Sequence, residues 1–478
     1  MASSSAVTLV ITTLALLAAA CGGSTPARPE PAPVATSIAI VGATLWDGTG
    51  RAPVPNAVTL VRNDRILCAG GAGECVVPAG SRVIDARGQY LIPGLIDSHV
   101  HLLFLTRGSA GEQLGLDLRD LLAQGITTVR DMGTDPAGLL SRVRSLQAAP
   151  RVHAMQLVAG RRFFFNGFHG TPTARGMIYR QPPAMAMQQL GWKPIQFDPG
   201  SDAEALVAEA GEAGAMGLKL YAHLESGSVR RITDAAHRAG MPVWGHAWVQ
   251  PASVMEQVTG GQNGVVHAAG LAGELFTVED RDTLVRDGDL QAATAAVATV
   301  GAAHDPRVLA TLDSMARTGT MLEPTLDAVR HSVASYDAKL RHIPSLQEDY
   351  VRSAARFGME VTREAVKRGV RISAGSDHVA YGPASDRATL FGELRLLVDS
   401  IGLSPTAALL AATRDAARAI GGKPGRQVGT IQKGRYADLV LLAKDPLQDI
   451  ANLEYVELVM IGGKMWRPGQ LRSGIAMR

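Results

Sequence analysis

Apolar and polar residues alternate in short runs at both ends of the chain. In residues 37–92 these runs are broken by Gly and Pro, and similar runs return in residues 427–478. Alternation with a period of two, bounded by turn residues, is typical of β-strands. Because a long middle segment separates the two sets, we expect one composite β-sandwich domain assembled from both chain ends.

The middle segment, residues 93–426, shows strand-like and helix-like runs that follow one another. Eight apolar runs are predicted to be strands: residues 94–101, 126–132, 152–158, 217–221, 242–248, 264–268, 320–325 and 370–377. Helix-like runs between them include residues 202–211, 228–239, 309–317 and 350–368. This pattern indicates an α/β fold with a (β/α)8 TIM-like barrel, in which ligands bind at the carboxyl ends of the strands.

The first 36 residues indicate export. Residues 7–20 form an apolar run shorter than the roughly 20 residues of a membrane-spanning helix, and this length fits the core of a signal peptide. The run leads into Ala18-Ala19-Ala20-Cys21, which is similar to a bacterial lipobox, although cleavage of an ordinary secretory signal remains open. We expect a signal peptide in residues 1–21, a tether in residues 22–36, and a periplasmic protein or one anchored to the outer membrane through Cys21.

Composition narrows the class of protein. Hydrophobic residues make up 46% and charged residues 19%, a globular balance that excludes a collagen-like or disordered chain. The net charge of +3 comes without a basic stripe, so we expect no nucleic-acid partner. Three cysteines are too few for a Cys-rich zinc site. Cys68 and Cys75 flank a Gly-rich stretch, and both a disulfide and two free thiols remain open.

The first barrel strand carries a pair of histidines. His99 and His101 are two residues apart and therefore point to the same side of the strand, on the order of 7 Å apart. Both imidazoles can reach one metal ion at this spacing. Two hydrogen-bonded core histidines would show the same pattern, so further ligands are needed.

Lys219 is unusual because it interrupts an apolar strand in a chain with 39 Arg and only 8 Lys. Burial of a bare ammonium group is costly and favours the neutral amine. A neutral amine can react with CO2 to give a carbamate, whose two oxygens can bridge two metal ions. A lysine paired with a carboxylate is the alternative.

Three further ligand-type residues end predicted strands. His246, His267 and Asp377 end the fifth, sixth and eighth strands. The carboxyl ends of all barrel strands converge on one pocket. We therefore expect one metal site formed by His99, His101, Lys219, His246, His267 and Asp377.

These motifs resemble the amidohydrolase superfamily of metal-dependent hydrolases, over about residues 38–470. The resemblance includes the segment Pro93-Gly94-Leu95-Ile96-Asp97-Ser98-His99-Val100-His101 and the Gly429-Thr430-Ile431 and Ala437-Asp438-Leu439-Val440 motifs near the end. It implies two divalent ions, expected to be zinc. His99, His101, Asp377 and carbamylated Lys219 would hold the more buried ion, and the same carbamate, His246 and His267 the more exposed one.

The resemblance also implies a mechanism. A hydroxide that bridges the two metal ions would attack the substrate, and Asp377 would pass a proton to the leaving nitrogen. Tyr221 faces the same way as Lys219 and is expected to donate to the oxyanion, unless it only packs at the barrel rim. His223 continues this face and is expected to touch substrate, whereas His378 is expected to point away.

The connection after the third strand contains four phenylalanines between residues 160 and 170. This composition indicates a lid or an apolar wall over the pocket. His169 stands where relatives that resemble imidazolonepropionases and prolidases carry a substrate-facing histidine. Arg161 or Arg162 can clamp a substrate carboxylate. A loop that contacts a membrane or a second subunit remains open, as does homo-oligomer formation.

We expect hydrolysis of a C–N amide bond in a small dipeptide-like or N-acyl amino acid substrate. Hydrolysis of a lactone or a phosphotriester at the same binuclear site remains open. An aminohydrolase (deaminase) is disfavoured, because Trp248 stands where such relatives carry Glu. A scaffold protein without activity is disfavoured because every expected metal ligand is present.

Overall fold

The computed structural model describes residues 37–102, 110–133, 135–160, 194–221, 223–247, 249–277, 301–331, 345–379 and 389–476. The chain divides into the short unit Met1–Ala35 and the unit Thr36–Arg478, which contains all described residues. The expected signal peptide, the tether and Cys21 lie outside the described residues. None of the helices within the described ranges is both long and apolar enough to span a bilayer.

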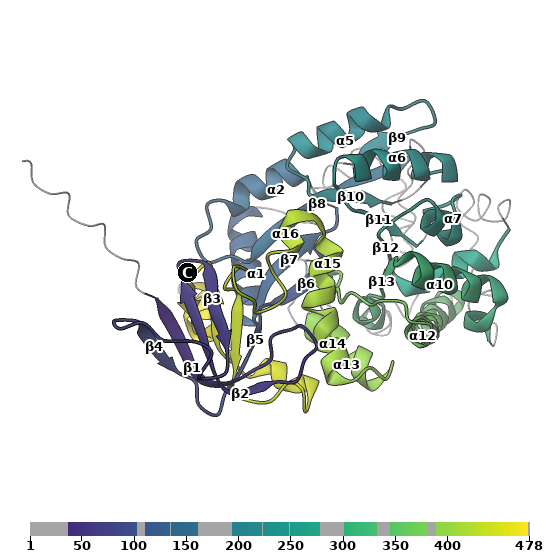
Figure 1. Cartoon of the computed structure of the whole chain (residues 1–478). Helices are drawn as coiled ribbons and strands as arrows, with labels where there is room; N and C mark the ends of the chain where they lie inside the picture. The colour runs from purple at the N-terminus through teal and green to yellow at the C-terminus, as the bar shows by residue number, and fades with distance from the viewer. Residues whose placement is uncertain are drawn as a thin grey trace, which may run out of the picture. The chain divides into compact units, whose positions relative to one another are not determined.

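Strands from both chain ends form one hydrogen-bonded sheet in the order β17-β16-β15-β5-β1-β2-β3, with β4 beside β1. Figure 1 shows the purple strands of the amino-terminal part next to the yellow strands of the carboxyl-terminal part. The composite β-domain of the expected fold is therefore present. Its strands are β1 (Ile38–Leu45), β2 (Val54–Arg62), β3 (Arg65–Gly70), β4 (Arg82–Asp85), β5 (Tyr90–Pro93), β15 (Leu439–Leu442), β16 (Val456–Ile461) and β17 (Lys464–Trp466).

The two halves of this sheet share one apolar core. β15 pairs antiparallel with β5, and Val440 lies opposite Ile92. Buried side chains of both halves pack together, among them Ile40, Leu91 and Met460. Removal of this apolar surface from water stabilises the pairing of segments that lie far apart in sequence.

A disulfide closes the turn that follows β3. Cys68 in β3 is bonded to Cys75, with their Cα atoms 5.8 Å apart. Of the two possibilities left open by the sequence, the structure confirms the bridge.

The second sheet has the order β13-β12-β11-β10-β8-β7-β6-β14, with β9 beside β8. Its strands run parallel, as in the pairing of β10 with β11. The order follows the chain, as the barrel prediction requires. The strands are β6 (Leu95–His101), β7 (Ile126–Asp131), β8 (Arg151–Gly160), β9 (Ile195–Phe197), β10 (Gly217–Leu220), β11 (Val243–His246), β12 (Gly264–Val266), β13 (Met321–Glu323) and β14 (His378–Val379).

The segment before β14 links the two edges of this sheet. Leu322 of β13 forms a parallel bridge with Ile372, and the Ser98 amide donates to the carbonyl of Ala374 at 3.1 Å. The expected (β/α)8 fold is confirmed, but the eighth predicted strand, residues 370–377, is largely irregular. The regular strand of this region, β14, starts one residue later and contains only His378–Val379. The short β9 was not predicted.

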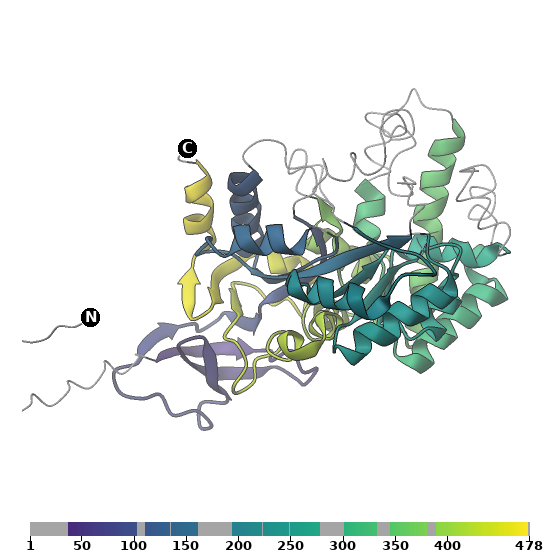
Figure 2. The same cartoon turned by 90° about the horizontal axis from the view of Figure 1, so that it is seen from above.

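Helices cover the outside of the barrel sheet, as the second view shows (Figure 2). The four helices predicted from the sequence correspond to α5, α6, α10 and α12. The helices are α1 (Ala110–Ala123), α2 (Pro136–Val143), α5 (Ala203–Glu212), α6 (Ser226–Arg238), α7 (Val254–Thr259), α10 (Pro306–Thr318), α12 (Ser345–Lys367), α13 (Leu390–Asp399), α14 (Pro405–Ala411), α15 (Arg414–Ile420), α16 (Gly422–Gly425) and α17 (Pro468–Ala476), with 3-10 turns η1 (Ala268–Leu275), η2 (Ala302–His304) and η4 (Ile450–Glu454).

Local sequence explains where these helices begin. The Asp202 side chain accepts hydrogen bonds from the first amides of α5, and Asp305 does the same for α10. α10 also has a proline in its first turn, where the missing amide proton costs nothing. Along α6, Val229, Ile232 and Ala236 are buried at helical spacing.

Candidate metal centre

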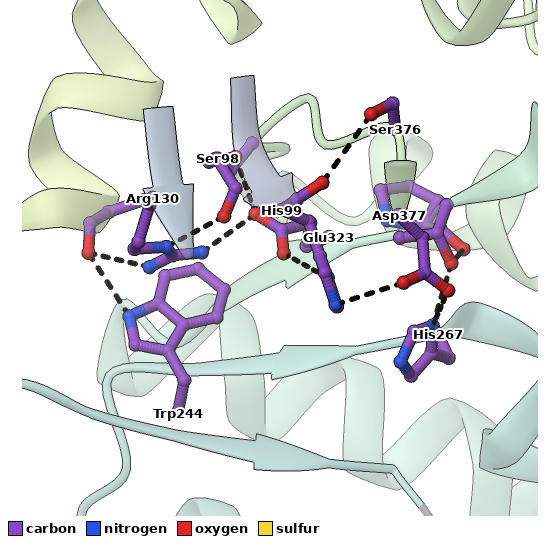
Figure 3. Close-up of polar contacts among 12 residues, drawn as sticks. Ser98, His99, Arg130, Trp244, His267, Glu323, Ser376 and Asp377 are labelled. Carbon is purple, nitrogen blue, oxygen red and sulfur yellow. Dashed lines mark hydrogen bonds and ion pairs between the residues drawn. The ribbon is translucent and has the colours of Figure 1, made fainter. Parts of the chain in front are cut away.

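The carboxyl end of β6 and the segment before β14 bring three ligand-type side chains together (Figure 3). The Nε2 atoms of His99 and His101 are 3.3 Å apart, and both lie 3.2–3.4 Å from Asp377 Oδ1. One ligand atom from each residue lies within 4.8 Å of the other two. Two imidazole nitrogens and a carboxylate oxygen at this spacing suit a divalent metal ion.

His246 and His267 lie next to this group, at the ends of β11 and β12. Their ring centroids are 4.5 Å apart, and the ring of His267 lies 5.0 Å from that of His99. His267 Nδ1 is 2.8 Å from the hydroxyl of Thr325. Three of the four predicted histidines therefore lie within 4 Å of Asp377, and His246 lies beside the third, His267.

Lys219 lies in the middle of β10 and is 1% exposed. Its Nζ atom has no hydrogen-bond partner among the described residues. Burial lowers the pKa of Lys219 to about 7, although the negative charges of Glu323 and Asp377 act in the opposite direction. A buried amine without a partner is uncommon and indicates a missing group. The donor set and this amine fit a metal site completed by a modified lysine.

Glu323 is a buried member of the site that the sequence analysis missed. It ends β13 and accepts a hydrogen bond from His99 Nδ1 at 2.8 Å and another from Arg130 at 2.8 Å. Because a carboxylate can only accept, the Nδ1 atom of His99 carries the proton. Its Nε2 atom therefore presents a lone pair toward Asp377, as a metal ligand requires.

Arg130 forms a buried ion pair with the Glu323 carboxylate. It is fully buried, donates to the carbonyls of Ser98 and Ala419, and lies 4.0 Å above the ring of Trp244. Burial alone would raise the pKa of Glu323, but Arg130 and the hydrogen bond from His99 together hold it below its usual value. Glu323 is thus a carboxylate near neutral pH.

The sequence contained an indication of the Arg130–Glu323 pair. Arg130 and Glu323 each lie within a segment that the sequence predicts to be a strand, as Lys219 does. A charged residue buried in a strand usually has a partner, but the sequence alone does not show that β7 and β13 place these two in contact.

Asp97 holds the segment that carries Asp377. Its carboxylate accepts hydrogen bonds from the amide and the hydroxyl of Ser376. Burial raises the pKa of Asp97 to about 7, although these hydrogen bonds act in the opposite direction. The backbone of Asp377 has a φ of 55° and that of His267 a φ of 68°. Such left-handed conformations outside glycine are concentrated at functional sites.

Tyr221 follows β10, and its ring centroid lies 5.1 Å from that of His246. Burial raises the pKa of Tyr221, and the charge of Asp377 raises it further, so the phenol keeps its proton. His223 lies beside the end of β8, since a Cβ on Gly160 would fall 1.8 Å from its carbonyl oxygen. Its contact with substrate stays a prediction.

Other predicted substrate residues, Arg161, Arg162 and His169, lie outside the described residues, as does Trp248. His378 belongs to β14, where it pairs with Val100, and it is not part of the set formed by His99, His101 and Asp377.

A parallel barrel with histidines and an aspartate at the carboxyl ends of its strands, and a buried lysine within one strand, is typical of a metal-dependent hydrolase. The sequence pattern of the amidohydrolase family matches residues 90–466, and the chain belongs to this family.

Individual relatives agree with this assignment. The chain is 27% identical over 429 residues to the imidazolonepropionase of Symbiobacterium thermophilum, which covers 82% of this chain and 85% of the relative. A prolidase solved with N-methylphosphonate-L-proline has a TM-score of 0.67 and 22% identity, covering 90% of this chain and 99% of that one. A molinate hydrolase has a TM-score of 0.68 and 20% identity, covering 91% and 96%. At these identities the structural matches show the shared fold.

Proposed function

We propose that the protein hydrolyses a C–N amide bond in a small dipeptide-like or N-acyl amino acid substrate. The observation that carries this proposal is the convergence of His99, His101 and Asp377 beside the buried amine of Lys219. The relatives support the bond type. One is named an imidazolonepropionase, and another binds N-methylphosphonate-L-proline, whose tetrahedral phosphorus on a proline nitrogen has the shape of an attacked amide.

Two metal ions, with zinc as the expected metal, complete the proposed site. His99, His101 and Asp377 would hold one ion, His246 and His267 would hold the other, and a carbamate on Lys219 would serve both. When bound, the ions would acidify a water molecule and polarise the scissile carbonyl.

The protein side chains supply the remaining steps. Asp377 accepts a proton from the attacking water and passes it to the leaving nitrogen. The protonated phenol of Tyr221 donates a hydrogen bond to the oxygen that gains charge in the transition state. Glu323 keeps the Nδ1 proton on His99, and Asp97 keeps Asp377 in place.

Substrate recognition is assigned to the connection after β8. Arg161 or Arg162 would bind a free carboxylate through two parallel hydrogen bonds, and His169 and His223 would contact the amide or the carboxylate. Nearby phenylalanines would favour an apolar or aromatic side chain on the substrate.

We also propose that the protein works outside the cytoplasm, as its first residues suggest. The Cys68–Cys75 bridge supports this location, because disulfides persist in oxidising compartments and are rare in the cytosol. Lipidation of Cys21 is the proposed form of attachment to a membrane.

A substrate panel tests the proposed function. Protein loaded with zinc in bicarbonate buffer is assayed with Xaa-Pro and other dipeptides, N-acyl amino acids, lactones and a phosphotriester. We expect the highest kcat/KM for an amide with a free carboxylate, and a loss of about 10²–10⁴-fold in kcat for Asp377→Asn. Faster hydrolysis of a lactone or the phosphotriester than of every amide would reject the proposal in favour of that reaction.

A further inference from the structure

A cavity lies where β8 begins, at the opposite end of the barrel strands from the metal centre. It has a volume of about 710 Å3, within the range of small-molecule sites. Its wall includes Pro150 to His153, where β8 begins, and residues of the β-domain such as Tyr436 and Trp466. β8 is ten residues long, so its far end beside His223 is about 30 Å away. We call this space the basal cavity.

Positive charge dominates the basal cavity. Arg65, Arg151, Lys423 and Lys464 line it, and no Asp or Glu does. Two carboxylates outside the lining pair with the arginines: Asp438 lies 2.7 Å from Arg151, and Asp64 lies 3.6 Å from Arg65. The two lysines are exposed and form no ion pair within the part of the chain that the structure describes. The cavity therefore keeps a net positive charge, because the charges of Lys423 and Lys464 are not compensated.

The two arginines are held rigidly. Their guanidinium carbons lie 3.8 and 3.7 Å from the centroid of the Tyr436 ring, so they stack on opposite faces of it. Gln427 and the carbonyl of Gly434 bind one terminal nitrogen of Arg65, and Asp438 binds two nitrogens of Arg151. One terminal nitrogen of each guanidinium has no hydrogen-bond partner among the described residues, and its position is fixed before any ligand arrives.

The rest of the cavity wall consists of apolar side chains and a histidine nitrogen without a hydrogen-bond partner among the described residues. Val143, Leu146, Val152 and Trp466 provide an apolar surface. His153 also lines the cavity, and its buried Nε2 atom has no hydrogen-bond partner among the described residues. An apolar wall, fixed donors and an unused buried nitrogen are features of a ligand site.

We propose that the basal cavity binds a small organic anion with one phosphate or carboxylate group and a flat apolar body. Lys423, Lys464 and the free nitrogens of the two arginines hold the charged group. Trp466 and its apolar neighbours cover the body. A metal ion does not suit this site, because the cavity offers cations where a metal needs carboxylates or thiolates.

Calorimetric titration of the zinc-loaded full chain tests the proposal, with phenyl phosphate, phenylacetate and uncharged benzyl alcohol as probes. We expect one of the two anions to bind and benzyl alcohol to bind at least tenfold more weakly. Tighter binding of phenyl phosphate identifies a phosphate ligand, and tighter binding of phenylacetate a carboxylate. Equal binding of benzyl alcohol, or no binding of either anion, would overturn the proposal.

Two charge-matched double variants locate the binding. Lys423→Glu with Lys464→Glu reverses both cavity lysines, whereas Lys433→Glu with Lys444→Glu makes the same charge change at exposed lysines outside the cavity. Anion binding should weaken at least tenfold in the first and stay within about twofold in the second, with amide turnover unchanged in both. Equal weakening in both variants, or none in the first, would reject the site.

Discussion

Lys219, Arg130 and Glu323 are ionisable side chains in the buried interior of the barrel. Arg130 and Glu323 are fully buried and paired, whereas the amine of Lys219 has no hydrogen-bond partner among the described residues. Removal of one partner of a buried ion pair destabilises the protein, because the other charge then stays buried without a partner. The pair therefore positions His99, and the amine without a partner is the group to which the proposed function assigns the carbamate.

Glu323→Gln tests this positioning role. The change removes the charge opposite Arg130, so we expect the free energy of unfolding to fall by about 3–5 kcal/mol. Glutamine keeps only one acceptor oxygen, uncharged, for which Arg130 competes, so the weaker hold on His99 Nδ1 should reduce zinc affinity about 10–100-fold, measured by competition with a chelator. Glu393→Gln is the control, since Glu393 is equally buried but contacts the amide of Asp327. Wild-type zinc affinity in Glu323→Gln would contradict the role.

His153 gives a prediction for pH. Burial lowers the pKa of His153 to about 4, and the charge of Arg151 contributes. The unfolded chain takes up this proton near pH 6.5 while the folded chain does not. Stability should therefore fall as pH drops from 6.5 toward 4, by up to about 2 kcal/mol at pH 5. Urea unfolding of His153→Gln at pH 7.5 and 5 should show a smaller pH effect than the wild type, whereas exposed His237→Gln should match it.

At the level of elements, regular strands and helices were predictable and irregular ones were not. The strand that ends in His99 and His101 is followed by helices and strands whose apolar periodicity is plain in the sequence. Residues 370–377 fit a strand pattern in the sequence, yet they join the sheet through an isolated bridge of Ile372 with Leu322 and separate backbone hydrogen bonds, not as a regular strand. The predicted ligands meet because parallel strands end at one face. Cross-strand partners such as Glu323 were missed because their pairing depends on the barrel's closure.

The Cys68–Cys75 bridge is testable at the same level. It closes a short loop beside β3, so its loss in Cys75→Ser should cost about 2–3 kcal/mol of stability. The melting temperature of the wild type should fall on reduction, and that of Cys75→Ser should not change. Thiol counting on denatured, unreduced protein gives a second check. Two free thiols at these positions would contradict the bridge.

The molecule as a whole depends on pairing between its two ends. The predicted composite domain is confirmed because both ends show the same alternation, but the order in which β15 joins β5 was not readable from either end alone. Side chains from residues 427–478 supply Ile431, Leu439, Leu441 and Met460 to the core that they share with β1 and β5.

A chain that ends at residue 426 tests this dependence. It loses the four core side chains named above and further buried ones such as Val440 and Leu442, each worth roughly 1.5–3 kcal/mol. Their sum reaches the whole stability of a typical domain. We expect no cooperative thermal transition by circular dichroism. A chain that begins at residue 36 is the control and should melt like the wild type. Native-like melting of the shortened chain would show that the barrel folds without the carboxyl-terminal strands.

The central claim is that the residues around His99, Asp377 and Lys219 form a metal-dependent amide-hydrolysing centre. The most direct test is amide turnover recorded while metal-free protein is titrated with zinc in bicarbonate buffer. The account predicts no turnover without metal and a rise to a plateau near two equivalents, with Lys219→Ala recovering activity only when a small carboxylate is added. Full turnover in metal-free protein, or in Lys219→Ala without added carboxylate, would contradict it.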